Sequence, residues 1–310
     1  GEGGVGACCY VVVGTGLVKP KEPEPTEGRI LLFQLVDGSL ELRHEQPTKG
    51  AVYCLEAIGS RLLAGVNNKL QCYEWLPEQG RIALRAEHCG HILVLYVQAR
   101  GDFILVGDLM KSISLLRWTQ GGIVELARDY NAHWMTAVSF LDDDTFLGAE
   151  NRLNLFVARK RADAATEEER GNLEVVGEFH LGEFVNRFRR GSLTMQMPEG
   201  GTPPMKTTLY GTVNGAVGVL ARLPQEHFAI LAKVQSSLSR VIKGVGGLSH
   251  SEWRSFVNDR KSVDAHGFID GDLLESFLEL APAKMDEVVK GLDISVEQLS
   301  CMLEELSRLH

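Results

Sequence analysis

The hydrophobic and polar positions of this chain repeat a short pattern. An apolar run ends in a small residue and a glycine, a short polar turn follows, and a second apolar run begins. Copies of this pattern occupy residues 63–70, 105–112, 147–153 and 209–216, with an earlier copy at 13–16. Three of the anchoring glycines, Gly65, Gly107 and Gly148, lie 42 and 41 residues apart. A period near 40 residues filled with short β-rich segments predicts β-propeller blades, which bury their faces by stacking around an axis.

Two regions of the chain differ in the spacing of their apolar residues. From residue 8 to about residue 222, β-branched and aromatic residues alternate or form short runs bounded by turn residues, which predicts strands. After Pro224, apolar residues recur mainly at helical spacing. The expected helices cover residues 228–242, 250–258, 270–280, 283–291 and 295–309. We therefore predict a mainly β fold, with antiparallel four-stranded propeller blades in residues 1–222 and a small all-α C-terminal domain in residues 223–310.

Turn and loop signals punctuate the strand-rich region. Asp37-Gly38 and Asn214-Gly215 each predict a two-residue hairpin turn, because these residue types tolerate the positive φ that such turns require. Three segments rich in proline, glycine or charge are expected to be loops, and the second can hold a helical turn. These segments are residues 19–25, 161–172 and 198–204.

Three acidic or polar signals have a structural and a chemical interpretation. Ser295 and Gln298 form a capping-box pair that predicts a helix start. Asp270 resembles the first ligand of a calcium loop, but the glutamate expected at loop position twelve is Ala281, so we predict a helix N-cap. The acidic run 142–144 lacks partner ligands and predicts a hairpin tip rather than a metal site.

The charge balance argues against a surface that holds nucleic acid by itself. The chain has 32 Lys and Arg against 41 Asp and Glu, a net charge of −9. The only dense basic cluster, Arg187, Arg189 and Arg190, fits a solvated strand face. No run of 18 apolar residues is present to cross a membrane. The chain opens on Gly1 without an initiator Met, and we expect it to be a fragment of a longer protein.

No catalytic or metal-binding pattern is found in the sequence. None of the six cysteines falls in a pair with metal-ligand spacing, and Cys54 and Cys72 fit buried thiols in a reducing compartment. The nine histidines are scattered, and His180 between apolar neighbours fits a structural role. Nucleophile-elbow, P-loop and zinc-protease motifs are absent. We therefore expect no enzymatic activity, no cofactor and no metal.

Longer segments of the chain resemble a known family. The motifs GDFILVGDLM (101–110), WMTAV (134–138), FLGAEN (146–151), FHLGEFVN (179–186) and YGTVNG (210–215) resemble the third propeller of the damaged DNA-binding protein 1 family. WRSF (253–256) and GFIDGDLLESF (267–277) extend the resemblance into the helical tail. The resemblance covers essentially the whole chain. It implies a seven-bladed propeller, of which this chain holds about five blade equivalents.

This resemblance implies a scaffold or adaptor of cullin–RING ubiquitin ligases, with roles in DNA damage recognition and nucleotide-excision repair. In the family, the third propeller helps to bind substrate-receptor proteins, many of the WD-repeat type, through helical motifs. The cullin binds a propeller to which nothing in this chain corresponds, and damaged DNA is read mainly by the receptor. Such a protein is expected in the nucleus and also in the cytoplasm, without membrane contact.

The family's receptor-binding positions can be carried over residue by residue. They are Gly16, Pro23, Glu24, Tyr53, Leu93, Leu95, Tyr96, Leu109, Lys111, Arg128, Trp134, Asn151, Phe184, Asn186 and Val213. Their apolar and aromatic members suit an amphipathic helix, although Trp134 and Phe184 could instead pack blade against blade. Lys111 stands where the family usually has Arg, Leu93 where it has Met and Gly16 where it has Ala, which bears on receptor selectivity.

A second interpretation within the same superfamily is a scaffold subunit of an RNA-processing complex, for cleavage and polyadenylation or for splicing. Such subunits share the propeller and an Asp-Gly-Asp-Leu sequence near the tail. The tryptophan motif at 253–256 and the longer motif at 267–277 favour the ubiquitin-ligase adaptor.

Overall fold

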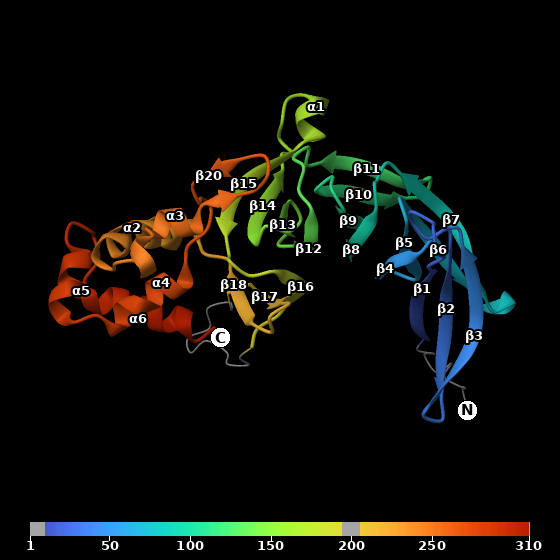
Figure 1. The fold of residues 1–310 in the computed structure, drawn as a ribbon, viewed down its shortest axis with the longest axis horizontal. Helices are drawn as coiled ribbons and strands as arrows, with labels where there is room; N and C mark the ends of the chain where they lie inside the picture. The colour runs from blue at the N-terminus through green and yellow to red at the C-terminus, as the bar shows by residue number, and fades with distance from the viewer. Residues whose placement is uncertain (1–9, 194–204, 310) are drawn as a thin grey trace, which may run out of the picture. The chain divides into compact units, whose positions relative to one another are not determined.

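The computed structural model describes residues 10–193 and 205–309 (Figure 1). The chain divides into two compact units, each of which is described by itself. The first comprises residues up to 144 together with 160–174, and the second comprises 145–159 together with 175 onward.

The first unit consists mainly of antiparallel sheets whose strands follow one another in chain order. One three-stranded sheet has the order β1-β2-β3, and two four-stranded sheets contain β4 to β7 and β8 to β11. The strands are β1 (Tyr10–Leu17), β2 (Glu27–Val36), β3 (Ser39–Thr48), β4 (Val52–Ile58), β5 (Arg61–Val66), β6 (Lys69–Leu76), β7 (Arg81–Cys89), β8 (Val94–Arg100), β9 (Phe103–Asp108), β10 (Ile113–Thr119), β11 (Gly122–Arg128) and β12 (Met135–Phe140). Figure 1 shows these successive antiparallel sheets from blue to green. The predicted fold class of propeller-type blades is thereby confirmed.

The repeated glycines lie where one sheet packs closely against the first strand of the next. A Cβ on Gly65 of β5 would lie 2.5 Å from Cys54 Sγ and 2.7 Å from the Val94 carbonyl oxygen. A Cβ on Gly107 of β9 would lie 2.7 Å from Val138 Cγ1. Apolar side chains from β4 to β6 and from β8 to β10 form one core around these contacts. The 42-residue spacing therefore reflects one close contact repeated in successive blades.

The second unit contains the later strands and the helices from α2 onward. Strands β13 (Thr145–Glu150) and β14 (Asn154–Lys160) form an antiparallel hairpin, and β15 is Leu173–His180. Strands β16 (Val185–Arg190), β17 (Thr207–Thr212) and β18 (Val217–Ala221) form a three-stranded sheet in chain order. The expected loop at 198–204 lies outside the described residues.

The helical part of the second unit surrounds a single apolar core. Its helices are α2 (Gln225–Val241), η2 (Val245–Gly247), α3 (His250–Arg254), α4 (Gly271–Glu275), η3 (Ser276–Glu279), α5 (Pro282–Val289) and α6 (Val296–Ser307). Leu231, Leu238, Phe277, Leu299 and Leu303 are buried in this core, which joins α2, η3 and α6. The fold class prediction of a small helical C-terminal part is confirmed. The division into domains 1–222 and 223–310 stays a prediction.

Local signals in the sequence agree with several turns and caps. Asp37 and Gly38 have φ of 49° and 83° and join β2 to β3 as a two-residue turn. Ser295 and Gln298 form the expected capping box of α6. Asp270 is the N-cap of α4. Helix α1 (Glu167–Arg170) is the helical turn expected within the charged loop.

Two local predictions are wrong. The turn at Asn214-Gly215 is longer than two residues: the Thr212 N–H donates to the Ala216 carbonyl, and only Gly215 has positive φ. The helix expected over 250–258 ends at Arg254, because the chain then enters a short hairpin of β19 (Phe256–Val257) and β20 (Ser262–Val263). Burial of Phe256 and this strand pairing outweigh the helical spacing.

Candidate partner-binding site

One backbone hydrogen bond recurs at the equivalent place in three of the sheets. The residue that follows a blade's second strand donates its N–H to the residue that precedes the first strand. Asn67 donates to Ala51 (3.1 Å), Leu109 to Leu93 (3.0 Å) and Val213 to Phe184 (3.0 Å). The last two pairs consist entirely of residues predicted to bind a partner. These predicted residues therefore occupy equivalent places in the repeat.

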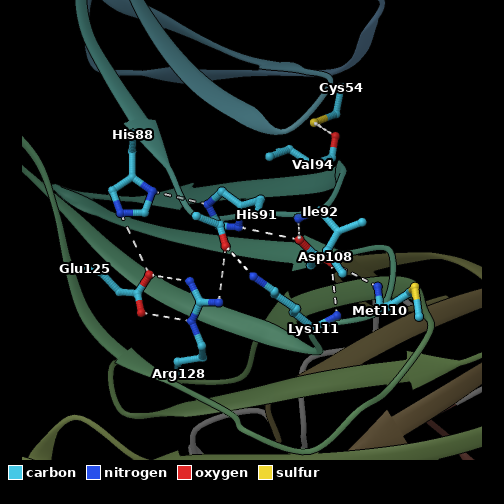
Figure 2. A network of polar contacts seen from close by, with 11 residues as sticks. Cys54, His88, His91, Ile92, Val94, Asp108, Met110, Lys111, Glu125 and Arg128 are labelled. Atoms are coloured by element: carbon cyan, nitrogen blue, oxygen red, sulfur yellow. Dashed lines mark hydrogen bonds and ion pairs between the residues drawn. The ribbon is translucent and has the colours of Figure 1, made fainter. Parts of the chain in front are cut away.

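Asp108, the last residue of β9, accepts hydrogen bonds from backbone N–H groups next to Leu93 and Leu109 (Figure 2). Its Oδ2 accepts the Ile92 N–H at 2.7 Å, and its Oδ1 accepts the N–H groups of Met110 (2.9 Å) and Lys111 (3.0 Å). Asp108 is buried, whereas Ile92, Met110 and Lys111 are exposed. One buried carboxylate thus fixes the backbone at two exposed places, Ile92 and residues 110–111.

The Gly90 carbonyl accepts hydrogen bonds from two cationic side chains (Figure 2). Lys111 Nζ donates to it at 2.9 Å and Arg128 Nη1 at 3.4 Å. Arg128 also binds Glu125 with two parallel hydrogen bonds, Nε–Oε1 at 2.9 Å and Nη2–Oε2 at 2.7 Å. Burial opposes ionisation of Glu125, but the Arg128 hydrogen bonds and charge outweigh it and hold the pKa of this carboxyl below its usual value. The hydrogen bond that Arg128 donates to Glu125 likewise raises the pKa of Arg128.

Two histidines flank Gly90 in the sequence, and we call residues 88–91 the Gly90 turn. His88 Nδ1 and His91 Nε2 are 3.3 Å apart, and His91 Nδ1 lies 3.7 Å from Asp108 Oδ2. Burial, followed by the His88 charge, lowers the pKa of His91 to about 4. Burial also lowers the pKa of His88. Both rings are therefore neutral at physiological pH and serve to pack and fix the turn.

A second buried aspartate connects this network to Trp134. Asp129 Oδ2 accepts the Ser112 hydroxyl at 2.6 Å, and the Ser112 N–H donates to the His133 carbonyl at 3.2 Å. His133 immediately precedes Trp134, whose side chain is 42% exposed. The loop that carries Trp134 is thus fixed to the loop that carries Lys111. We call the exposed residues Ile92, Met110, Lys111, Tyr130 and Trp134 the rim.

Asn67 has a comparable role in the preceding blade. Its side-chain Oδ1 accepts the Ala51 N–H, and its Nδ2 donates to the Pro25 carbonyl, both at 2.8 Å. The second bond fixes the proline-rich loop that holds Pro23 and Glu24, which are both exposed. A Cβ on Gly16 would lie 2.5 Å from the Ala51 Cβ, so a larger residue there needs a shift of the chain at Ala51.

The described residues contain no group of three His, Cys, Asp or Glu side chains arranged to hold a metal ion. Within residues 10–193 and 205–309, none of the helices has the length and hydrophobicity of a membrane-spanning segment. Cys72 is buried, and burial raises the pKa of its thiol to about 11, so it is a packing residue.

Comparison with known proteins decides the family. Residues 5–279 match the family described as the CPSF A subunit region. The chain belongs to this family. It is 57% identical over 306 residues to DNA damage-binding protein 1a of Arabidopsis thaliana, and 56% identical to DNA damage-binding protein 1 of Oryza sativa subsp. japonica and of Solanum lycopersicum. Each alignment covers 97% of this chain and 28% of the relative, so the chain spans little more than a quarter of the relatives' length. The resemblance expected from the motifs is confirmed.

The structure brings some of the predicted partner-binding residues of this family member together. In the first unit, the Asp108 and Gly90 contacts bring together Leu93, Leu109, Lys111 and Arg128, with Trp134 attached through Ser112. Leu95 and Tyr96 follow on β8 and are half-buried, and Tyr53 on β4 is exposed. The remaining predicted residues, Asn151, Phe184, Asn186 and Val213, belong to the second unit. Asn151, Asn186 and Val213 are exposed, and Phe184 is half-buried.

Several residues that shape the site were not singled out from the sequence. They are the buried Asp108 and Asp129, the half-buried Glu125, the Gly90 turn and the exposed Ile92, Met110 and Tyr130. The signal available for the two aspartates is their place directly after an apolar strand, where an Asp side chain commonly binds backbone N–H groups of the following turn. The role of Gly90 has no local signal, because it depends on side chains 21 and 38 residues away.

A second polar cluster lies in the second unit and is structural. Arg254 of α3 is buried; its Nε binds Asp270 at 2.6 Å and its Nη1 binds the carbonyls of His180 (3.3 Å) and Leu181 (3.0 Å). Its guanidinium lies 4.8 Å from the Phe179 ring centroid. His180 Nδ1 contacts Asn154 Oδ1 at 2.8 Å, in agreement with the structural role expected from the sequence. These contacts attach α3 to the end of β15.

Proposed function

We propose that this chain docks substrate-receptor proteins within a cullin–RING ubiquitin-ligase adaptor, with roles in DNA damage recognition and nucleotide-excision repair. The observation that carries the proposal is the rim: exposed apolar side chains on loops whose backbone is fixed by buried aspartates. The names of the relatives, DNA damage-binding protein 1 and 1a, support it. The proposal makes the chain a binding surface and not an enzyme.

The rim has the chemistry of a protein-binding surface. Trp134 is 42% and Tyr130 76% exposed, and exposed aromatic residues of this kind dominate the energy of protein interfaces. Preorganised loops lose little conformational entropy on binding, which favours affinity. A helical motif of a WD-repeat receptor suits such a surface, because its apolar face can bury exposed apolar side chains such as Trp134.

The remaining expectations fit the same proposal. The cullin binds a region of the longer protein outside this chain, and damaged DNA is contacted mainly through the receptor. The protein acts in the nucleus and also in the cytoplasm. The predicted contact residues of the second unit, including Phe184 and Val213, are proposed as receptor contacts of that unit. Residues 1–222 and 223–310 are proposed as its two domains.

The test is a titration of a purified WD-repeat substrate receptor against the full-length protein. We expect Trp134→Ala to weaken binding by at least about 30-fold, equivalent to about 2 kcal/mol, because an interface aromatic anchor is lost. The control is Leu84→Ala on the outer strand β7, where an exposed leucine should be removed without effect. Receptor binding that is unchanged by Trp134→Ala contradicts the proposed surface.

A second candidate, an RNA-processing scaffold, is supported by the description of the matched family as the CPSF A subunit region. It predicts that the full-length protein co-purifies with polyadenylation or splicing factors and not with a cullin. Quantitative mass spectrometry of complexes from cells distinguishes the two candidates.

A further inference from the structure

The basic cluster of β16 is exposed in the fold and directly precedes an exposed serine. Arg189 and Arg190 are the last two residues of the strand, and both are exposed. Ser192 follows after Gly191 and is exposed, and the next residue, Leu193, is 52% exposed. Arginines therefore stand three and two positions before the serine, and an apolar side chain stands directly after it.

This order occurs at one place in the chain. Ser192 is the only Ser or Thr of the sequence with Arg or Lys at both the −3 and the −2 position. Ser262 comes nearest, with Arg260 and Lys261 directly before it, but its −3 residue is Asp259. Ser262 also lies within the β19–β20 hairpin, whereas Ser192 lies outside any strand.

The backbone at the end of β16 presents this segment to another protein. β16 is an edge strand of its sheet, with β17 as its neighbour. Successive side chains of a strand point to opposite faces, so Arg189 and Arg190 project in different directions. Thr207 holds Gly191 by two hydrogen bonds: the Gly191 N–H donates to the Thr207 carbonyl at 3.3 Å, and Thr207 Oγ1 donates to the Gly191 carbonyl at 2.5 Å. Ser192 follows directly after this attachment.

Gly191 makes the exit from the sheet possible. Its φ is 143°, in the region that favours glycine. No described residue other than its chain neighbours comes within 4 Å of the place of a Cβ on Gly191. The segment from Arg189 to Leu193 is therefore held at one end by the strand and has open space where it leaves the sheet.

We propose that Ser192 is phosphorylated by a protein kinase whose substrate groove binds arginines at −3 and −2 in acidic pockets and an apolar side chain at +1. A guanidinium binds a carboxylate through two parallel hydrogen bonds, so each arginine has a specific place in such a groove. Ser192 Oγ forms a bond to the γ-phosphorus of Mg-ATP, and the bond from this phosphorus to the β–γ bridging oxygen breaks. The hydroxyl proton passes to the catalytic base of the kinase, and ADP leaves. The phosphate adds a charge of about −1.5 to −2 beside the basic cluster.

Ser192 lies away from the predicted receptor contacts of the same strand. Phe184 directly precedes β16, whereas Ser192 follows its last residue by two positions. The six residues of the strand between them span about 20 Å. Phosphorylation of Ser192 therefore does not depend on receptor docking, and its test needs no receptor.

The test uses the folded full-length protein, Mg-ATP and the catalytic subunit of cyclic AMP-dependent protein kinase, which selects arginines at −3 and −2. The initial rate of phosphate incorporation is measured, and the modified residue is located by tandem mass spectrometry of the tryptic peptide 191–206. We expect the phosphate on Ser192 and its loss in Ser192→Ala.

Variants of the strand distinguish specific recognition from general attraction of charge. Arg189→Gln and Arg190→Gln should each lower the initial rate at least about tenfold, because each removes one charge-assisted pair with the kinase. Arg187→Gln is the matched control, since it removes an exposed arginine of the same strand at the −5 position. It should change the rate by less than about twofold, as for an exposed charge outside the groove.

Three results would overturn the proposal. The first is no incorporation into the folded protein, or incorporation at Ser192 only after heat denaturation, because the fold then withholds the segment. The second is phosphate on Ser262 or another residue in place of Ser192. The third is an equal loss of rate in Arg187→Gln, Arg189→Gln and Arg190→Gln, which would show that net charge and not the order of residues attracts the kinase.

Discussion

The Asp108 carboxylate accepts the Ile92 N–H at 2.7 Å, although the two residues are 16 positions apart. The same carboxylate binds Met110 and Lys111, so a single buried side chain satisfies three N–H groups. We expect Asp108→Ala to destabilise the rim by about 3 kcal/mol, because each unsatisfied N–H group costs about 1 kcal/mol or more. Hydrogen exchange of these three amides in the full-length protein measures the effect. Unchanged protection contradicts the role of Asp108.

Acid should loosen the Gly90 turn through His91. The pKa of this buried ring is lowered from 6.5 to about 4, so the unfolded segment binds the proton more readily than the folded one. The contribution is complete above pH 6.5 and is lost as the pH falls toward 4. Between about pH 7.5 and about pH 5 the loss should be about 2 kcal/mol.

Local opening free energies from hydrogen exchange over residues 88–93, at both pH values, test this. His91→Gln serves as the control, because it removes the titrating group and should flatten the difference. The same pH dependence in this variant would assign the effect to another group, such as His88, whose pKa is also lowered.

Gly65 should not tolerate a methyl group. In Gly65→Ala the new Cβ would lie 2.5 Å from Cys54 Sγ and 2.7 Å from the Val94 carbonyl oxygen, and backbone cannot move away cheaply. We expect a loss of about 1–3 kcal/mol from overpacking. Gly211→Ala is the matched control, since this repeat position has no atom within 4 Å of the added Cβ and no positive φ. Hydrogen exchange in β5 and in β17 reports the two effects separately.

The buried ion pair of Arg254 and Asp270 should be essential for attaching α3. Burial opposes ionisation of Asp270, but hydrogen bonds from His250 and Arg254 outweigh it and lower its pKa. Arg254→Met leaves the buried carboxylate without its main partner, which should cost about 3–5 kcal/mol. Arg152→Met, which removes an exposed ion pair with Asp259, should cost less than about 1 kcal/mol. Equal exchange rates of α3 amides in the two variants would contradict this ranking.

Direct binding of duplex DNA should be weak. With a net charge of −9 and no basic stripe, we expect a Kd of about 10⁻⁴ M or weaker near about 0.15 M salt. Fluorescence anisotropy with the full-length protein, with and without a WD-repeat receptor, measures this. Tight binding of lesion-bearing DNA in the absence of a receptor would show that the functional surface lies elsewhere.

The local periodicity of the sequence determined the secondary structure. Alternating apolar residues predict the strands of each blade, and Ser295, Gln298, Asp270 and the Asp37-Gly38 pair predict caps and a turn, because these effects act within a few residues. The helix expected through Asn258 was wrong for the same reason: its end depends on β19 pairing with β20, which the local pattern does not contain.

The family resemblance gave the predicted contact residues, but only the tertiary structure separates their roles. In the sequence, Lys111 and Arg128 are two cations that no local pattern distinguishes. In the fold, Arg128 is bound to Glu125, while the Lys111 ammonium donates to the neutral Gly90 carbonyl. The two converge on Gly90 from 21 and 38 residues away. Such roles depend on which strand ends lie close together in the folded protein. Hydrophobic periodicity reports on a few neighbouring residues and therefore does not predict this proximity.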